Sequence, residues 1–252
     1  MRIEAIIPPM IKLAAFDLDG TLARIGEGIE REDCQILVAL EELGTRIAIV
    51  SGKPAFYLCG FMRQVNLSSP ILLGENGGVI EFGTDVPPIN YTTLSFSESA
   101  RKTIDWLRSR FSEAIPSLWY QPNIIGLTPF PRSSSEFDII QRIIDENADF
   151  IRDVDIYRHI DSFDITPKGI NKYRGLETLG RLLSISREES AAIGNGVNDY
   201  PMFEYAGLSL GVNIPDESRV TRNFADIHEA LLYLLEHVKE ERAHSCNDST
   251  IS

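Results

Sequence analysis

The sequence predicts an α/β protein in which a parallel sheet carries helices on its faces and a smaller α+β module is inserted. Short apolar runs alternate with amphipathic segments up to residue 82 and again after residue 167, a pattern typical of parallel sheets with connecting helices. Between these stretches the order changes to helix, strand, helix, strand, strand. We therefore expect a core of residues 1–82 and 167–240, an inserted module of residues 83–166 and a polar tail of residues 241–252.

The first part of the core contains strands that end in polar loops. Leu13–Phe16 is apolar throughout, as expected for a strand buried on both faces. The next helix has Ile36, Leu37 and Leu40 on one face and stops at Gly44. The expected elements are a strand over 13–16, a helix over about 31–43, a strand over 46–50, a helix opened by Pro54 and a strand over 70–73.

The remaining elements follow from the same patterns. In the inserted module we expect helices over about 98–111 and 134–147, a strand-like stretch over 118–127, and β-prone runs over 154–159 and 162–166. In the returning core we expect a helix over about 171–183, strands over 191–193 and 208–212, a short helix over 200–205 and a last helix near 227–235.

Composition narrows the classes of partner and location. A net charge of −13 argues against a nucleic-acid partner, because nucleic-acid phosphates are bound by clustered Lys and Arg, but it permits local binding of a phosphorylated small molecule. No apolar run reaches the roughly 20 residues of a membrane span, and residues 1–10 lack signal-peptide features. The 3 cysteines without metal-type spacing indicate a reducing compartment. We expect a cytoplasmic monomer or homodimer without a membrane or nucleic-acid partner.

The first chemical signal is Asp17-Leu18-Asp19-Gly20-Thr21, directly after the first strand. Residues i and i+2 of an extended chain project to the same side, so Asp17 and Asp19 can face one reacting centre. Two carboxylates beside a phosphate repel it and each other, and a divalent cation would offset that repulsion. Gly20 permits a sharp turn, and Thr21 offers a hydroxyl and an amide to phosphate oxygens. The competing interpretation is a surface Asx turn or a fragment of a calcium loop.

Further polar groups stand at the expected carboxyl ends of strands, where open parallel sheets bind ligands. Ser51 and Gly52 can bind an anion through a hydroxyl and free amides, or simply cap a helix. Lys172 can neutralise charge on a phosphoryl group, with Lys168 as a nearby rival. The loop Gly194–Asp199 supplies oxygen ligands on a glycine-rich turn. Within the inserted module the candidate anion-binding side chains are Arg132, Arg152, Arg158 and His159.

Together these motifs, in this order, resemble those of the haloacid dehalogenase superfamily of phosphatases. Asp17-Leu18-Asp19-Gly20-Thr21-Leu22 matches the first motif of that superfamily, and the resemblance covers about residues 11–236. It implies a Rossmann-like core, and the insertion is similar to the superfamily's C2-type caps. Gly74-Glu75-Asn76-Gly77-Gly78 and the modest cap size look most like archaeal-type phosphoglycolate phosphatases. Sugar-phosphate and mannosyl-phosphoglycerate phosphatases are similar as well.

The resemblance also implies roles for individual residues. Asp17 would be the nucleophile, and Asp19 would act as general acid and then general base while giving the metal its main-chain carbonyl. Lys172 is preferred to Lys168 because the superfamily's lysine follows a Gly-x-x pattern, here Gly169-Ile170-Asn171. The expected phosphate-binding residues are Thr21, Ser51, Gly52 and Lys172, and the expected magnesium ligands are Asp17, Asp19, Asn195 and Asp199, with Asn198 supporting their loop.

Asn195 departs from the superfamily pattern, which usually has an aspartate at that position. An amide oxygen can coordinate a hard cation but contributes no charge, so we expect weaker magnesium binding. The expected function is magnesium-dependent hydrolysis of small phosphate monoesters through a phospho-aspartate intermediate, with phosphoglycolate or a sugar phosphate as substrate. The alternatives are a non-catalytic relative that binds a phosphorylated ligand, a phosphomutase and a dinucleotide-binding oxidoreductase. The last lacks a glycine at position 199.

Overall fold

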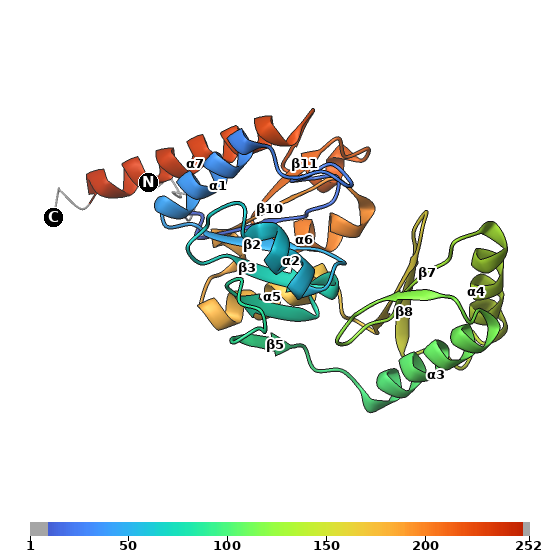
Figure 1. Cartoon of the computed structure of the whole chain (residues 1–252). Coiled ribbons are helices and arrows are strands. Elements are labelled where there is room, and N and C mark those ends of the chain that lie inside the picture. Colours follow the sequence, from blue (N-terminus) through green and yellow to red (C-terminus); the bar gives the residue numbers. More distant parts are fainter. Residues whose placement is uncertain (1–9, 249–252) are drawn as a thin grey trace, which may run out of the picture.

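The computed structural model describes residues 10–248 and contains a large sheet covered by helices, with a smaller unit beside it (Figure 1). The strands of the large sheet are β1 (Leu13–Phe16), β2 (Arg46–Val50), β3 (Ile71–Gly74), β4 (Val79–Phe82), β5 (Tyr91–Thr93), β10 (Ser190–Gly194), β11 (Leu208–Val212) and β12 (Arg222–Phe224). Their order is β12-β11-β10-β1-β2-β3-β4-β5, parallel from β12 to β3 and antiparallel at β4 and β5. The predicted α/β class is confirmed, while β4, β5 and β12 had not been predicted.

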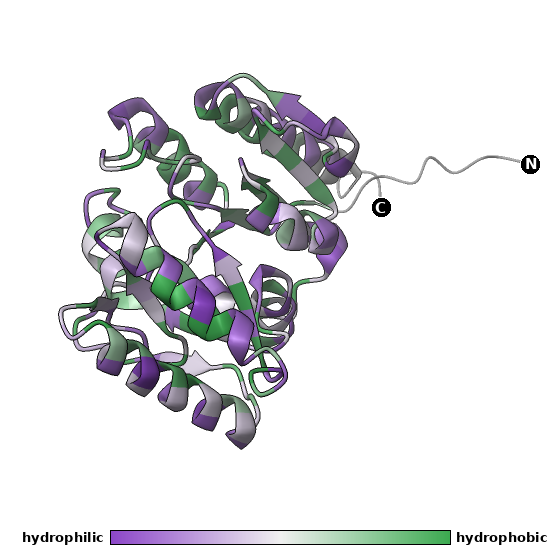
Figure 2. Ribbon diagram, turned by 90° about the vertical axis from the view of Figure 1, so that its right-hand side faces the viewer, coloured by the Kyte–Doolittle hydropathy of each residue, from purple (hydrophilic) through white to green (hydrophobic). Residues whose placement is uncertain are grey.

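Alternate residues of the central strands face two helical layers. The helices are α1 (Arg31–Glu42), α2 (Ala55–Met62), α5 (Lys172–Leu183), α6 (Tyr200–Tyr205) and α7 (Ile227–Asp248). In β1, Ala14 and Phe16 pack in an apolar cluster with residues of α1, α2 and α7, whereas Leu13 and Ala15 pack in a second cluster with α5 and α6. Both faces of the strand are therefore buried, which explains its continuous apolar sequence. Figure 2 shows the helices carrying hydrophobic and hydrophilic residues side by side, as this two-layer packing requires.

Residues 98–167 form the smaller unit, called the cap below. It consists of α3 (Glu98–Ala114), β6 (Trp119–Gln121), β7 (Thr128–Phe130), α4 (Ser134–Glu146), β8 (Val154–Arg158) and β9 (Phe163–Pro167). β6 pairs with β7 and β8 with β9, and a bridge between Leu127 and Ile165 connects the two hairpins. The cap has an apolar cluster of its own, in which Leu107, Phe111 and Phe163 are completely buried.

Polar side chains fix where several helices begin. Ser97 accepts a hydrogen bond from the Ala100 amide at 3.0 Å, and Ser133 accepts one from the Glu136 amide at 3.3 Å. Asn171 accepts one from the Arg174 amide at 3.0 Å. Each caps amides that lack a partner inside the helix. The Asn171 cap starts α5 at Lys172 and so places this expected site residue in the first turn of the helix.

The element boundaries differ from the expected ones in three places. Residues 91–93 form β5 of the large sheet rather than the start of the cap, and the exposed edge position explains why they lack an apolar pattern. The stretch 118–127 is not one strand, because β6 ends at Gln121 and β7 begins at Thr128. α7 continues through the expected polar tail to Asp248, since exposed polar residues can extend a helix.

Residues 1–9 of the expected core and 249–252 of the expected tail lie outside the described part of the chain. Among residues 10–248, no helix combines the length and the apolar character needed to cross a membrane.

Candidate active site

The predicted site residues meet at the carboxyl ends of neighbouring strands in the centre of the sheet. β1 lies between β10 and β2, and all three run in the same direction. Asp17 follows β1, Ser51 follows β2 and Asn195 follows β10, so parallel pairing brings their loops to one edge. Lys172 reaches the same place from the first turn of α5. Segments that are far apart in the sequence thus build one site.

Lys172 lies between two buried carboxylates. Its Nζ is 2.6 Å from Asp17 Oδ1 and 2.6 Å from Asp199 Oδ1. The three side chains are 1%, 6% and 0% exposed, respectively. Buried charges require partners, and two carboxylates around one ammonium leave an excess negative charge. The rival Lys168 is exposed, and its Nζ donates to the main-chain carbonyl of Arg152 at 3.2 Å.

Burial and mutual interaction shift the pKa values of this cluster. Burial raises the pKa of Asp17 to about 6; Lys172 opposes the shift and Asp199 adds to it. Burial lowers the pKa of Lys172, but the carboxylates of Asp17 and Asp199 outweigh burial and hold the pKa above its ordinary value. Lys172 therefore remains charged at neutral pH, whereas burial brings the pKa of Asp17 closer to neutral pH. Such perturbed groups in a cleft mark candidate catalytic sites.

Asp199 organises the loop that follows β10. Its Oδ2 accepts hydrogen bonds from the amides of Asn195 at 2.8 Å and Gly196 at 2.9 Å, while its Oδ1 contacts Lys172. Both carboxylate oxygens are therefore engaged within the protein. Asn198, expected to support this loop, lies along the wall of the adjacent cavity.

Oxygen atoms of Asp17 and Asn195 converge on Thr21. Thr21 Oγ1 lies 3.0 Å from Asp17 Oδ2 and 3.1 Å from Asn195 Oδ1, and its single proton can be donated to one of them. The carboxylate oxygen of Asp17 and the amide oxygen of Asn195 are hard metal ligands, and with the nearby excess negative charge they suit magnesium. Within residues 10–248 no group of three His, Cys, Asp or Glu side chains could hold a metal ion. A magnesium site here would thus depend on the Asn195 amide and on main-chain oxygen as well as Asp17.

Asp19 and the loop after β2 form the wall facing solvent. Asp19 is partly exposed, and its Oδ2 lies 3.9 Å from Lys53 Nζ. Ser51 is buried, and its Oγ accepts a hydrogen bond from the Lys53 amide at 3.2 Å. Gly52 lies in the same loop, and its carbonyl accepts a hydrogen bond from Nε2 of Gln121 in the cap at 3.0 Å. Sequence reasoning had not included Lys53, although it follows Ser51 and Gly52 directly.

A cavity of about 420 Å³ lies between these loops and the cap. Of the candidate cap groups, His159 lines it, while Arg132, Arg152 and Arg158 do not. Asp164 is held inside by three groups: Asn76 Nδ2 donates at 3.2 Å, Thr128 Oγ1 donates at 3.0 Å, and His159 Nε2 lies 3.2 Å away. The carboxylate in turn raises the pKa of His159 by its hydrogen bond and charge.

Sequence reasoning had missed Gln121, Thr128 and Asp164 as cavity residues. Asp164 carries a visible signal, because it interrupts an apolar strand segment between Phe163 and Ile165.

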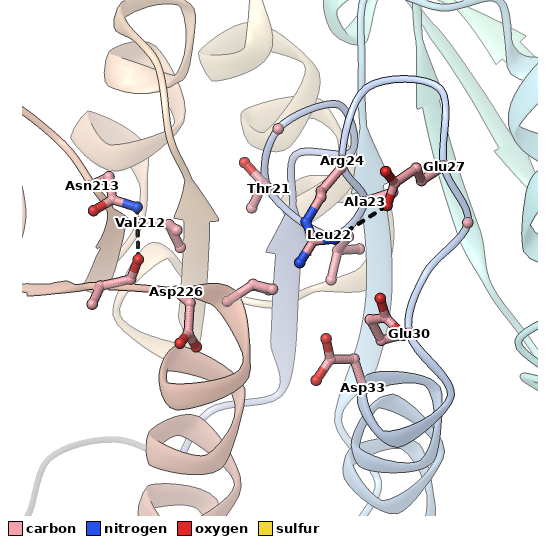
Figure 3. Close-up of a pocket in the computed structure, with 14 residues that line it drawn as sticks. Thr21, Leu22, Ala23, Arg24, Glu27, Glu30, Asp33, Val212, Asn213 and Asp226 are labelled. Carbon is pink, nitrogen blue, oxygen red and sulfur yellow. Dashed lines mark hydrogen bonds and ion pairs between the residues drawn. The ribbon is translucent and has the colours of Figure 1, made fainter.

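A smaller cavity of about 220 Å³ lies beside α1 and the start of α7 (Figure 3). Its wall includes Thr21, Arg24, Glu27 and Asp33 but not Asp17 or Lys172. Arg24 pairs with Glu27, and Asp33 lies 2.7 Å from His228 Nδ1. Glu27 and Asp33 thus have partners within the protein. The larger cavity is the better candidate for catalysis because Asp17 lines it.

A sequence profile described as haloacid dehalogenase-like hydrolase matches residues 14–155 and 132–216. The chain belongs to this family. The matched ranges include the positions of Asp17, Lys172 and Asp199. The family resemblance and the expectation of an enzyme are confirmed.

Individual relatives of this haloacid dehalogenase-like hydrolase are distant but extend over nearly the same length. "Phosphoglycolate phosphatase" of Archaeoglobus fulgidus is 24% identical over 86% of this chain and 89% of its own. The protein of the same name from Halorubrum lacusprofundi is 25% identical over 91% and 93%. A haloacid dehalogenase-like hydrolase from Bacteroides thetaiotaomicron superimposes with a TM-score of 0.75 at 16% identity, covering 89% of this chain and 99% of that one.

A solved structure described as a HAD subclass IIB sugar phosphatase gives a TM-score of 0.65 at 19% identity, covering 91% of this chain and 98% of that one. At this level of identity the structural matches establish the fold.

Proposed function

We propose that this enzyme hydrolyses small phosphate monoesters through a covalent phosphoryl intermediate on Asp17. The observation that carries the proposal is the buried Lys172 ammonium 2.6 Å from Asp17 Oδ1, with Thr21 Oγ1 3.0 Å from Asp17 Oδ2. This arrangement holds the Asp17 carboxylate in place with hydrogen-bond donors around it, which supports its role as the nucleophile. Phosphoryl transfer needs these two elements and a cation to offset charge.

The chain's own groups account for two half-reactions. The Asp17 carboxylate attacks phosphorus, the bond from phosphorus to the ester oxygen breaks, and Asp19 gives its proton to the departing alcohol. Asp19 then takes a proton from water, which attacks phosphorus and releases inorganic phosphate and free Asp17. Lys172, Thr21 and the loop at Ser51 and Gly52 hold the phosphoryl oxygens in both steps. Magnesium, held by Asp17, Asn195 and the Asp19 carbonyl with Asp199 nearby, would offset charge on the phosphoryl group.

The substrate class we propose is phosphoglycolate or a sugar phosphate. Support comes from the similarity to phosphoglycolate phosphatases and to a sugar phosphatase, and from the size of the cavity, about 420 Å³. Lys53 of the core loop supplies positive charge to the cavity, and His159, Gln121 and Thr128 of the cap supply hydrogen-bonding groups. A cavity of this size lined mainly by polar side chains suits a small polar ester rather than a macromolecule. The net charge of −13 further supports a small-molecule partner over nucleic acid. We further propose that the protein is a cytoplasmic monomer or homodimer.

Phosphate release from p-nitrophenyl phosphate, phosphoglycolate and a set of sugar phosphates tests the proposal. Each compound is assayed with magnesium and with EDTA, for the wild type and Asp17→Asn. The matched control is Asp105→Asn, which changes an exposed aspartate on α3. We expect release that requires magnesium and Asp17 and is unaffected in the control. Release by Asp17→Asn at more than about a tenth of the wild-type rate would contradict a role as nucleophile, given the losses typical of such residues.

A further inference from the structure

The segment Gly74–Gly78 takes no part in the chemistry above, yet it has an unusual backbone. Glu75 and Asn76 both have positive φ angles, +52° and +57°. Side chains other than glycine rarely adopt this conformation, and it persists where surrounding contacts impose it. Glu75 is also 2% exposed, which is costly for a carboxylate unless it is well bonded. Its contacts therefore need an explanation.

The Glu75 side chain holds the loop between β6 and β7 of the cap. Its Oε1 accepts a hydrogen bond from the Ile124 amide at 2.6 Å. Its Oε2 accepts hydrogen bonds from the amides of Ile125 and Gly126, both at 2.9 Å. Three successive amides thus converge on one carboxylate, an arrangement that suits an anion. All partners are donors, so a neutral amide side chain could not replace it without placing its own N–H groups against theirs.

The same dipeptide is bonded to the loop that is proposed to bind phosphate. The Glu75 amide donates to the Lys53 carbonyl, and the Asn76 amide donates to the Ser51 carbonyl, both at 2.9 Å. The Asn76 side chain donates to Asp164 of the cap at 3.2 Å. Glu75 and Asn76 therefore connect the phosphate loop, the β6–β7 loop and β9 through direct hydrogen bonds.

We propose that Glu75 is a positioning residue that holds the cap in a defined position relative to Asp17. The loop it holds is flanked by Gln121 and Thr128, which both line the cavity, so its position determines where these side chains meet a substrate. The carboxylate acts through the cap and not on the phosphoryl group. Its loss should therefore weaken substrate binding more than it slows the chemical step. The kinetic part of this inference rests on the proposed phosphatase function.

The test compares Glu75→Gln with the wild type by amide hydrogen exchange and by steady-state kinetics with p-nitrophenyl phosphate. The matched control is Glu81→Gln. Glu81 is equally buried, at 2% exposed, but its partner is Cys59 Sγ at 3.1 Å, within the core. Hydrogen bonds to a charged group contribute about 1.5–3 kcal/mol, which corresponds to at least about tenfold. We expect about tenfold faster exchange at residues 124–126 and about tenfold higher KM, with kcat changed less than about threefold, and neither change in the control.

A second variant distinguishes the loss of this contact from a general folding defect. Ile124→Pro removes one of the three amide donors from the cap side, at a half-exposed side chain, and leaves Glu75 intact. It should also speed exchange at residues 125 and 126. Unchanged exchange there in both variants, or a uniform rise through core and cap, would overturn the positioning role. Absence of phosphate release by the wild type would refute the proposed function instead, while the exchange data would still test Glu75.

Discussion

Replacing Lys172 with methionine removes the ammonium that two buried carboxylates share. At 2.6 Å and an effective dielectric constant of about 20, its attraction to each of Asp17 and Asp199 is about 6 kcal/mol. Desolvation of the ammonium and repulsion between the carboxylates offset most of this. Removing one partner of such a buried ion pair costs about 3–5 kcal/mol of stability. We expect Lys172→Met to destabilise the protein by that amount near pH 8.

The loss should depend on pH in a direction set by Asp17. Burial already raises the pKa of Asp17 to about 6, and Lys172 is a cause that lowers it, so the pKa rises further in the variant. A carboxyl whose pKa is higher in the folded state than in the unfolded state binds its proton more tightly when folded. The variant is therefore least stable above that folded pKa and recovers stability as the pH falls through it. Protonated Asp17 cannot act as a nucleophile, and loss of the Lys172 donor costs about a further 10²–10³-fold in kcat.

Urea denaturation at about pH 8 and about pH 5.5 measures this dependence, and magnesium-dependent phosphate release measures activity. Lys168→Met is the matched control, because Lys168 is exposed and lies outside the site; it should remain within about 0.5 kcal/mol of the wild type. A loss of less than about 1 kcal/mol for Lys172→Met near pH 8 would contradict a buried ion pair at this position. A larger destabilisation at the lower pH would contradict the expected titration of Asp17.

Three further predictions concern the metal, the cap cavity and the cap core. Asn195→Asp adds a charge beside Asp17 and should tighten magnesium binding on the order of tenfold, measured by isothermal titration calorimetry; unchanged affinity would exclude Asn195 as a ligand. Asp164 raises the pKa of His159, so Asp164→Asn should lower it in an NMR titration. In the wild type the ion pair between His159 and Asp164 stabilises the folded state at pH values below the raised pKa of His159 and above the lowered pKa of Asp164. Phe111→Ala should destabilise the cap by about 3–5 kcal/mol, measured by denaturation, and a loss below 1 kcal/mol would contradict its complete burial.

Much of the core could be predicted because its signals are local. The apolar run Leu13–Phe16 predicts a buried strand, and Asp17 and Asp19 directly after it predict a polar strand end. The structure places Asp17 and Lys172 together as expected, but the sequence alone left Lys168 as a rival. The edge strand β5 was missed because its residues are exposed, so burial imposes no pattern on them.

The sequence by itself determined the buried central strands, most helices, the polar residues at the strand ends and the apolar periodicity of the cap helices, because each is encoded within a few consecutive residues. The tertiary structure alone decided which groups Glu75 binds and how Asp164 meets both Asn76 and His159. The partners of Glu75 are main-chain amides of residues 124–126, which every residue except proline possesses and which therefore leave no mark in the sequence. Contacts across the cap and the core depend on how two separately packed units are placed, and only the folded chain fixes that placement.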